Sequence, residues 1–364
     1  MSARRPFPWH RVFHPLCGAD LGTLAGLVAR RGLPSWRGAG PLAVAASIAA
    51  ARLPFTALEL ALAPRPRAPA HPPVFIVGHP RSGTTHLHNL MAASGAFVTV
   101  PPVRAAMPWE ARTLSPLLRP FIDPYLPRTR LIDGVAMSPD APTEDEVGLA
   151  NMSRLSYFHA VYFPSRFETD YRAGLTLDAP PRALAARARA MRRYVGAMSR
   201  RHAPLLLKNP AYTAQVATLP RLFPGARVVH IRRAPEAVFA STRRTLRATL
   251  RELALQDWSG ADLEETILRT YPEVMDAVDA QAATLPRGTF AEVSFEDVVA
   301  RPLPVLAELW DRLDLPGAAE APGRIAAYLD TIAAYRPARD RLSPDDRAIL
   351  VRRWALPGGD ATAR

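Results

Sequence analysis

The fold of this chain follows from residues 74–85, which read VFIVGHPRSGTT. The first four residues are apolar and mostly β-branched or aromatic, and they predict a short strand over 74–77. After the second glycine, apolar residues recur at helical spacing and predict a helix over 84–93. We therefore expect a strand, a glycine-bounded loop and a helix in direct succession.

The loop between these two elements has the chemistry of an anion site. Gly78 and Gly83 have the spacing of a Walker A phosphate loop, but Thr84 stands where that motif has its lysine. Backbone amides at the helix start and the helix dipole favour an anion without the lysine, whereas its absence argues against hydrolysis of a nucleoside triphosphate. An ordinary glycine turn before a helix is the alternative. The residues expected to bind the anion are Arg81, Ser82, Gly83, Thr84 and Thr85.

Strands and helices alternate along the rest of the chain. Continuous apolar runs predict buried strands over 205–207 and 228–231, and a third strand is expected over 289–295. This alternation implies an α/β fold with a parallel sheet, helices on both of its faces, and ligands at the carboxyl ends of the strands. The helices expected between and after these strands cover 182–202, 212–223, 235–251 and 302–313.

Three polar side chains near the strand ends are candidates for a second anion contact. Lys208 is the only lysine of the sequence and follows the strand over 205–207; we expect it to contact an anion, with a surface or structural role as the alternative. Arg233 follows the next strand, and Ser241 lies about two helical turns further on, so both can converge on one anion unless they are merely solvated. Arg187 and other arginines of the helix over 182–202 fall mostly off its apolar stripe, and we expect them to be solvated.

The N-terminal part of the chain differs from the rest. An apolar stretch over 42–63 contains Arg52, Pro54 and Glu59, which disfavour a membrane-spanning helix and indicate one or two packed helices. A membrane-surface element and a true span are the alternatives. We expect three parts, a helical appendage with a proline-rich linker over 1–70, an α/β domain over 71–340 and a C-terminal tail over 341–364.

Composition limits the classes of partner. The chain has 364 residues, 46 Lys and Arg against 33 Asp and Glu, and a formal charge of +13, which favours anionic partners. No aromatic-interleaved basic stripe indicates a nucleic-acid site. The single Cys17 excludes an internal disulfide and a cysteine-based zinc site. No secretory signal is apparent, so a cytoplasmic location is expected, with membrane contact through residues 1–70 left open.

Several separate motifs resemble one family in order and spacing. They are FIVGHPRSGTTHLHNL over 75–90, PTEDEV over 142–147, LLLKNP over 205–210, FPGARVVHI over 223–231 and EVSFED over 292–297. Together they resemble the bacterial-type sulfotransferases that use 3′-phosphoadenosine 5′-phosphosulfate (PAPS). The resemblance covers roughly residues 72 to 340.

The resemblance implies a fold, a donor and site residues. It implies a P-loop NTPase-like three-layer α/β fold and PAPS as co-substrate, with no metal required. The family's 5′-phosphosulfate loop falls on residues 81–85, and its 3′-phosphate pair falls on Arg233 and Ser241. By analogy with phosphoryl transfer, the loop amides, Arg81 and Lys208 are expected to stabilise the departing phosphate.

Sulfuryl transfer also needs a general base that accepts the proton of the acceptor. We favour Glu144 in the acidic cluster over 143–146, and the other candidates are Asp145, Glu146, His79 and Asp133. Glu146 could instead form a capping box with Thr143. Glu296 and Asp297 are expected to cap a helix and pair with an arginine.

The acceptor is not encoded in any motif. It is expected to be a small-molecule, lipid or saccharide hydroxyl or amine, and the oligomeric state stays open. A nucleotide-dependent kinase, which would need Mg²⁺, and a non-catalytic nucleotide-binding scaffold are the alternative functions. The positions considered for acceptor binding are Trp109, Glu110, Tyr157, Phe158, Tyr162 and Phe163.

Overall fold

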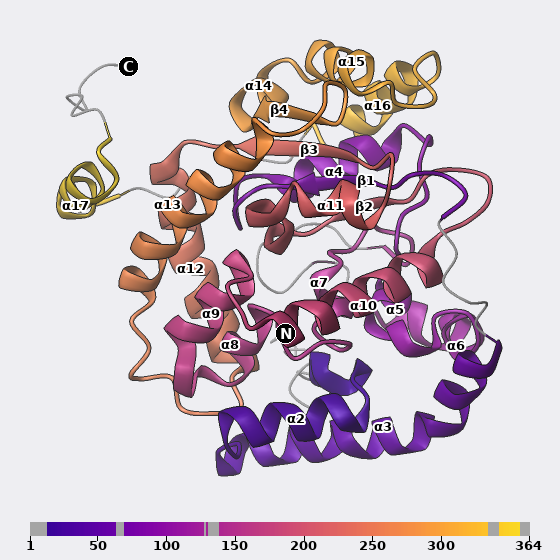
Figure 1. Cartoon of the computed structure of the whole chain (residues 1–364), viewed down its shortest axis with the longest axis vertical. Helices are drawn as coiled ribbons and strands as arrows, with labels where there is room; N and C mark the ends of the chain where they lie inside the picture. The colour runs from indigo at the N-terminus through magenta and orange to yellow at the C-terminus, as the bar shows by residue number, and fades with distance from the viewer. Residues whose placement is uncertain (1–12, 63–68, 127–128, 130–137, 334–341, 357–364) are drawn as a thin grey trace, which may run out of the picture.

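The computed structural model describes residues 13–62, 69–126, 129, 138–333 and 342–356 (Figure 1). The strands form one sheet in the upper half of the view, and the N-terminal helices lie along the lower margin. The elements in chain order are η1 (Pro15–Gly18), α2 (Leu21–Arg31), α3 (Trp36–Leu62), β1 (Val74–Val77), α4 (Thr84–Ala93), α5 (Pro102–Ala106), η2 (Pro108–Glu110), α6 (Leu114–Ile122), η3 (Asp123–Tyr125), α7 (Glu146–Leu149), α8 (Phe158–Tyr162), η4 (Pro164–Arg166), α9 (Phe167–Thr176), α10 (Pro181–Met198), β2 (Leu206–Lys208), η5 (Pro210–Gln215), α11 (Thr218–Leu222), β3 (Arg227–Arg232), α12 (Pro235–Leu253), α13 (Leu263–Ala282), β4 (Phe290–Ser294), α14 (Phe295–Ala300), α15 (Pro302–Leu313), α16 (Ala321–Thr331) and α17 (Pro344–Trp354).

The sheet confirms the predicted parallel arrangement. Its four strands have the order β2-β1-β3-β4, and each neighbouring pair is parallel. In register, Ile76 of β1 lies opposite Lys208 of β2, and Val77 lies opposite His230 of β3. The loop after β1 therefore lies between the carboxyl ends of its two neighbours, which is where parallel sheets bind ligands.

Helices cover both faces of the sheet, because alternate residues of β1 point into two different cores. Val74 and Ile76 pack in a cluster with residues of α4, α15 and α16. Phe75 and Val77 pack in another with residues of α10, α13 and η5. All four residues are buried, as their continuous apolar run predicts. The protein thus has the three-layer α/β architecture expected from the motifs.

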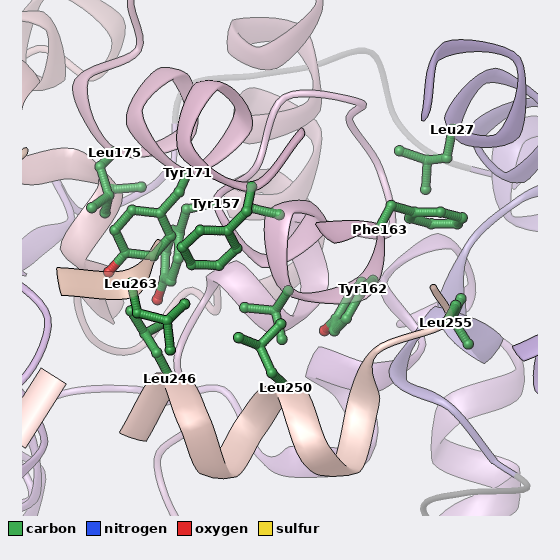
Figure 2. Packing of buried hydrophobic residues seen from close by; sticks show 14 of the residues in the cluster. Leu27, Tyr157, Tyr162, Phe163, Tyr171, Leu175, Leu246, Leu250, Leu255 and Leu263 are labelled. Carbon is green, nitrogen blue, oxygen red and sulfur yellow. The ribbon is translucent and has the colours of Figure 1, made fainter. Parts of the chain in front are cut away.

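A further cluster joins the N-terminal helices to the rest of the protein. Residues of η1, α2 and α3 pack there with residues of α8, α9, α12 and α13. Figure 2 shows Leu246 and Leu250 rising from α12 toward the rings of Tyr157 and Tyr162. The helices predicted for the N-terminal region are therefore present over the described part of it, and they contribute to a common core.

Two predicted helices differ from the structure. The helix expected over 182–202 ends at Met198, and residues 199–202 are not helical. The helix expected over 212–223 is divided into η5 and α11. Asn209 caps η5, since its side chain accepts a hydrogen bond from the amide of Ala211 at 2.9 Å. Pro220 lies in α11 and has no amide to donate to the preceding turn, so a continuous helix over this segment is disfavoured.

Candidate active site at the carboxyl edge of the sheet

The loop between β1 and α4 has the backbone of an anion cradle. Arg81 adopts φ +75°, a left-handed conformation that is uncommon for a residue with a side chain, and Gly83 adopts φ +99°. A Cβ atom at Gly83 would lie 2.2 Å from the ring of Phe295, so only glycine fits there. Successive residues in such turn conformations point backbone amides toward one side, where an anion can bind.

The start of α4 offers further donors to the same place. Gly83 is the N-cap of α4 and makes no side-chain cap hydrogen bond, and the positive end of the helix dipole at this position favours an anion. The hydroxyl oxygen of Ser82 is buried and has no hydrogen-bond partner among the described residues. A buried hydroxyl group without a partner is costly unless a ligand or water binds to it. These features fit an anionic group such as a phosphate or a sulfate ester.

The structure brings together two groups of residues that the sequence suggested separately as candidates for anion binding. The Nε atom of Arg81 donates to the hydroxyl of Ser241 at 3.1 Å. Arg233 donates from Nη1 to the backbone carbonyl of Arg81, also at 3.1 Å, and its guanidinium lies 4.6 Å from the centre of the Phe295 ring. Arg81 of the loop is therefore in direct contact with Arg233 before α12 and with Ser241 within it.

Lys208 and Glu144 form a buried pair at the end of β2. The Nζ atom of Lys208 lies 2.5 Å from Oε2 of Glu144, and their side chains are 2% and 13% exposed. Tyr157 donates from its hydroxyl to the other carboxylate oxygen of Glu144. Burial and the neighbouring carboxylate of Glu144 raise the pKa of Tyr157 well above its usual value, so Tyr157 stays protonated as a donor. Glu144 is thus held from both sides.

Backbone hydrogen bonds attach the segment that contains Glu144 to β2, which neighbours β1 and the loop after it. The amide of Asp145 donates to the carbonyl of Lys208 at 3.0 Å, and the amide of Thr143 donates to the carbonyl of Val100 at the same distance. Asn209, which follows Lys208, donates from its amide to the carbonyl of Ile76 in β1. The acidic turn, defined here as residues 143–146, is therefore attached to the strand next to the loop.

Glu146 has a different set of partners. Arg187 donates to both of its carboxylate oxygens, at 3.0 and 2.5 Å, and Asn209 donates to Oε2 at 2.6 Å. The alternative interpretation of Glu146, a capping box with Thr143, is wrong, because the N-cap of α7 is Asp145 and it makes no side-chain cap. The expectation that Arg187 is solvated is wrong, because it is buried in this ion pair and its charge requires a buried partner.

The remaining candidate bases are less suited to accept a proton. Asp145 is fully buried, and burial raises the pKa of its carboxyl group well above the usual value. His79 is also buried, which lowers the pKa of its imidazole to about 4. Its Nδ1 atom lies 2.9 Å from the carbonyl of Pro80. Asp133 lies outside the described residues.

Two acidic residues after β4 contribute to local structure. Ser294, which the sequence did not single out, caps α14 by accepting a hydrogen bond from the amide of Asp297. Asp297 itself lies 3.6 Å from Arg301, one turn away. Glu296 accepts a hydrogen bond from the amide of Ala234, just after Arg233. The carboxylates thus lie in the first turn, where the helix dipole favours them, but the cap is the serine.

Most of the aromatic positions considered for an acceptor belong to the core. Tyr157, Tyr162 and Phe163 are buried, and Phe158 packs against the same cluster. The indole of Trp109 donates to the carbonyl of Asn151 at 2.9 Å. Glu110 is buried and paired with Arg52 of α3. Among the described residues, no group of three His, Cys, Asp or Glu side chains is placed to hold a metal ion.

The side chains that orient Glu144 and Glu146 were not predicted from the sequence. Tyr157 was considered only for acceptor binding, yet it donates to Glu144, and Arg187 and Asn209 together hold Glu146. Asn209 directly follows Lys208 in the motif LLLKNP over 205–210, so the sequence could have indicated that it lies at the same strand end. No local pattern marked Tyr157 or Arg187.

Comparison with known proteins places these features in context. A family model described as "Sulfotransferase family" matches residues 72–320. The omega-hydroxy-beta-dihydromenaquinone-9 sulfotransferase Stf3 of Mycobacterium tuberculosis is 29% identical over 287 residues, which cover 78% of this chain and 74% of that protein. The Mycobacterium bovis protein of the same name matches equally well.

Two solved structures resemble the whole described architecture. Sulfotransferase STF9 from Mycobacterium avium has a TM-score of 0.69 at 17% identity and covers 93% of this chain and 95% of its own. Sulfotransferase STF1 from Mycobacterium tuberculosis has a TM-score of 0.64 at 19% identity and covers 92% and 90%. At these identities the likeness concerns the fold.

Proposed function

We propose that this protein transfers the sulfuryl group of PAPS to a hydroxyl or amine group of a small-molecule or lipid acceptor. The chain belongs to the sulfotransferase family and is an enzyme of that class. The observation that carries this proposal is the contact of Arg81 with both Ser241 and Arg233. It joins the phosphate loop to the start of α12, so that two anionic groups of one nucleotide can bind to one surface.

The donor would be held by two parts of this surface. Loop residues 81–85 would bind the 5′-phosphosulfate through the amides at the start of α4, the buried hydroxyl of Ser82 and the guanidinium of Arg81. Arg233 and Ser241 would bind the 3′-phosphate. Bound there, the donor supplies an activated sulfuryl group with a phosphate as its leaving group.

The residues around Lys208 would carry the proton and charge transfers. Glu144 would accept the proton of the attacking hydroxyl or amine, with Lys208 and Tyr157 orienting its carboxylate through hydrogen bonds. The ammonium group of Lys208 has three donors, so it can hold Glu144 and also stabilise negative charge that develops on the leaving phosphate. Arg81 would share that second role.

The class of acceptor is suggested by a relative and by the aromatic rings near Glu144. The relative Stf3 is named for an omega-hydroxylated dihydromenaquinone, which supports an apolar alcohol as acceptor. On this chain, Tyr157 links the base to an aromatic cluster, because its ring contacts those of Phe158 and Tyr171. An apolar alcohol is thus the first acceptor class to test.

Nucleotide binding tests the donor half of the proposal. Titration calorimetry should show tight binding of adenosine 3′,5′-bisphosphate without Mg²⁺ and much weaker binding of ATP with or without it. Arg81→Ala should weaken the bisphosphate by at least about tenfold, since charged hydrogen bonds contribute about 1.5 to 3 kcal/mol. Arg251→Ala, an exposed arginine at the end of α12, is the matched control and should bind as the wild type does.

Turnover tests the other half. A donor labelled in its sulfate should transfer label to some member of a panel of apolar alcohols, phenols, amines and saccharides. Preference for ATP with Mg²⁺ would favour a kinase, and tight binding of the bisphosphate without transfer to any acceptor class would favour a nucleotide-binding scaffold. Either result would contradict the proposed function.

A further inference from the structure

The helix α3 (Trp36–Leu62) is inverted relative to a helix of a soluble protein. Two of its three charged residues, Arg52 and Glu59, face the protein and are buried, whereas six of its large apolar residues are exposed. Among the described residues it is the one helix long and apolar enough to cross a membrane, yet only 17% of its most apolar window is buried. The exposed large residues are Trp36, Leu53, Phe55, Leu58, Leu60 and Leu62, called here the outward face of α3.

The two buried charges attach α3 firmly to the protein. Arg52 donates to Glu110 at 2.5 Å and to the carbonyl of Ala19 at 2.7 Å. Glu59 accepts hydrogen bonds from the amides of Arg112 and Thr113, at 3.1 and 2.9 Å, just before α6. A helix that leaves these contacts to span a bilayer would expose both charges to hydrocarbon, which is costly. Any partner that binds the outward face must therefore bind it while α3 stays packed against the rest of the protein.

We propose that the outward face of α3 lies on the surface of an anionic lipid bilayer. Between Leu21 and Leu62 the only acidic residue is Glu59, and it is buried, while Arg30 and Arg37 are exposed. The exposed side chains of this segment are therefore apolar or basic, apart from the small hydroxyl of Ser47, and none of them is acidic. Apolar residues that enter the headgroup boundary beside arginines that attract anionic lipid are the chemistry of an interfacial helix.

The start of α3 carries two residues that are expected at a membrane interface, Trp36 and Arg37. Trp36 is 81% exposed, and the guanidinium of Arg37 lies 5.0 Å from the centre of its ring. Tryptophan and arginine prefer the headgroup level.

A second copy of the chain fits this surface less well. Protein interfaces have about one hydrogen bond per 100 to 200 Å² and a polar rim. From residue 38 to residue 62, Ser47 is the one exposed polar residue, so few hydrogen bonds could cross such an interface. A bilayer interior needs none. The helix α6 begins at the amides that bind Glu59 and extends the apolar surface, because its Leu117 and Phe121 are exposed one turn apart.

Vesicle binding of the full chain tests this inference, which depends on neither the donor nor the acceptor. The wild type should sediment with vesicles of equal parts phosphatidylcholine and phosphatidylglycerol, less with phosphatidylcholine alone, and less as salt is raised. Leu58→Glu with Leu62→Glu places two carboxylates on the outward face and should weaken binding by at least about tenfold. Val299→Glu with Leu303→Glu, two exposed apolar residues at the same spacing on α14 and α15 at the opposite margin of Figure 1, should bind as the wild type does.

The outcomes separate a bilayer from other occupants. Circular dichroism and bisphosphate binding report whether the double variant is folded; should it not be, Trp36→Ala, which adds no charge, is expected to weaken vesicle binding about threefold. Failure of the wild type to bind either vesicle, equal loss in both double variants, or a wild-type dimer in solution that only Leu58→Glu with Leu62→Glu dissolves would overturn the proposal.

Discussion

The phosphate loop and the acidic turn lie at the same edge of the sheet, yet they are built in different ways. Loop residues 78–85 are contiguous, and their function depends on backbone conformation and on the start of one helix. The acidic turn has three adjacent carboxylates in different surroundings: Glu144 is bonded by Lys208 and Tyr157, Glu146 is bonded by Arg187, and Asp145 is fully buried. Local sequence thus predicts the conformation of the loop, whereas partners from other segments determine the surroundings of each acid.

The largest expected effect tests that division within the acidic turn. Glu144→Gln removes the proposed proton acceptor but keeps the shape, so kcat should fall by about 10²- to 10⁴-fold. Bisphosphate binding should change little, because the loop and α12 are untouched. Steady-state kinetics at saturating donor and acceptor measure the first quantity and calorimetry the second. An unchanged kcat would assign the base to another residue.

The second prediction concerns the acid two positions away. Arg187→Met leaves Glu146 buried without its cation, so the free energy of unfolding should fall by about 3 to 5 kcal/mol. Arg192→Met, on the exposed face of the same helix, should change it by less than about 0.5 kcal/mol. Urea unfolding compares the two variants. Equal stabilities would show that Glu146 does not depend on this ion pair.

A third prediction returns to the anion cradle. Ser241→Ala removes the hydroxyl that accepts a hydrogen bond from Arg81, and we expect about tenfold weaker binding of adenosine 3′,5′-bisphosphate. Thr249→Ala is the matched control, because Thr249 lies on the same helix and donates only to the carbonyl of Thr245. Calorimetry should find its affinity unchanged. Similar losses in both variants would point to an effect on α12 as a whole.

The smallest effect calibrates an ion pair that belongs to neither region. Burial raises the pKa of Glu292, but hydrogen bonds from His230 and Arg232 outweigh it and lower this pKa to about 2 from 4.5. Because the folded-state value is the lower one, this stabilisation is complete above pH 4.5 and is lost as the pH falls toward 2. The side chain is 39% exposed, so Glu292→Gln should cost about 1 kcal/mol at neutral pH.

The difference between wild type and Glu292→Gln should therefore shrink on acidification. Urea unfolding at a series of pH values measures it. A difference that stays constant from neutral pH down to the lowest pH at which the protein folds would show that the carboxylate charge is not its origin.

Much of the fold was predictable, because its signals are local. The apolar run before Gly78 and the helical spacing after Gly83 predicted β1 and α4 with their observed bounds. The helix over 302–313 is also observed as predicted. The division of the segment over 212–223 was not foreseen, since the apolar pattern there outweighed the constraint from Pro220.

The N-terminal helices mark the limit of such patterns. Arg52 and Glu59 argued against a membrane-spanning helix, and the structure holds both in buried contacts with the rest of the protein. Hydropathy alone could not show which side of α3 faces the protein, because its apolar residues occur all around the helix. Only the positions of Glu110 and the amides before α6 decided that the charges face inward.

The order of elements, the conformation of the phosphate loop and the class of chemistry were determined by the sequence itself, because each depends on residues that are neighbours along the chain. The contacts of Glu144 and Glu146, the burial of Arg187 and the apolar outward face of α3 were decided only by tertiary structure. Each of these depends on a partner from a distant segment, and the free energy of a buried charge is determined by that partner rather than by its neighbours in sequence.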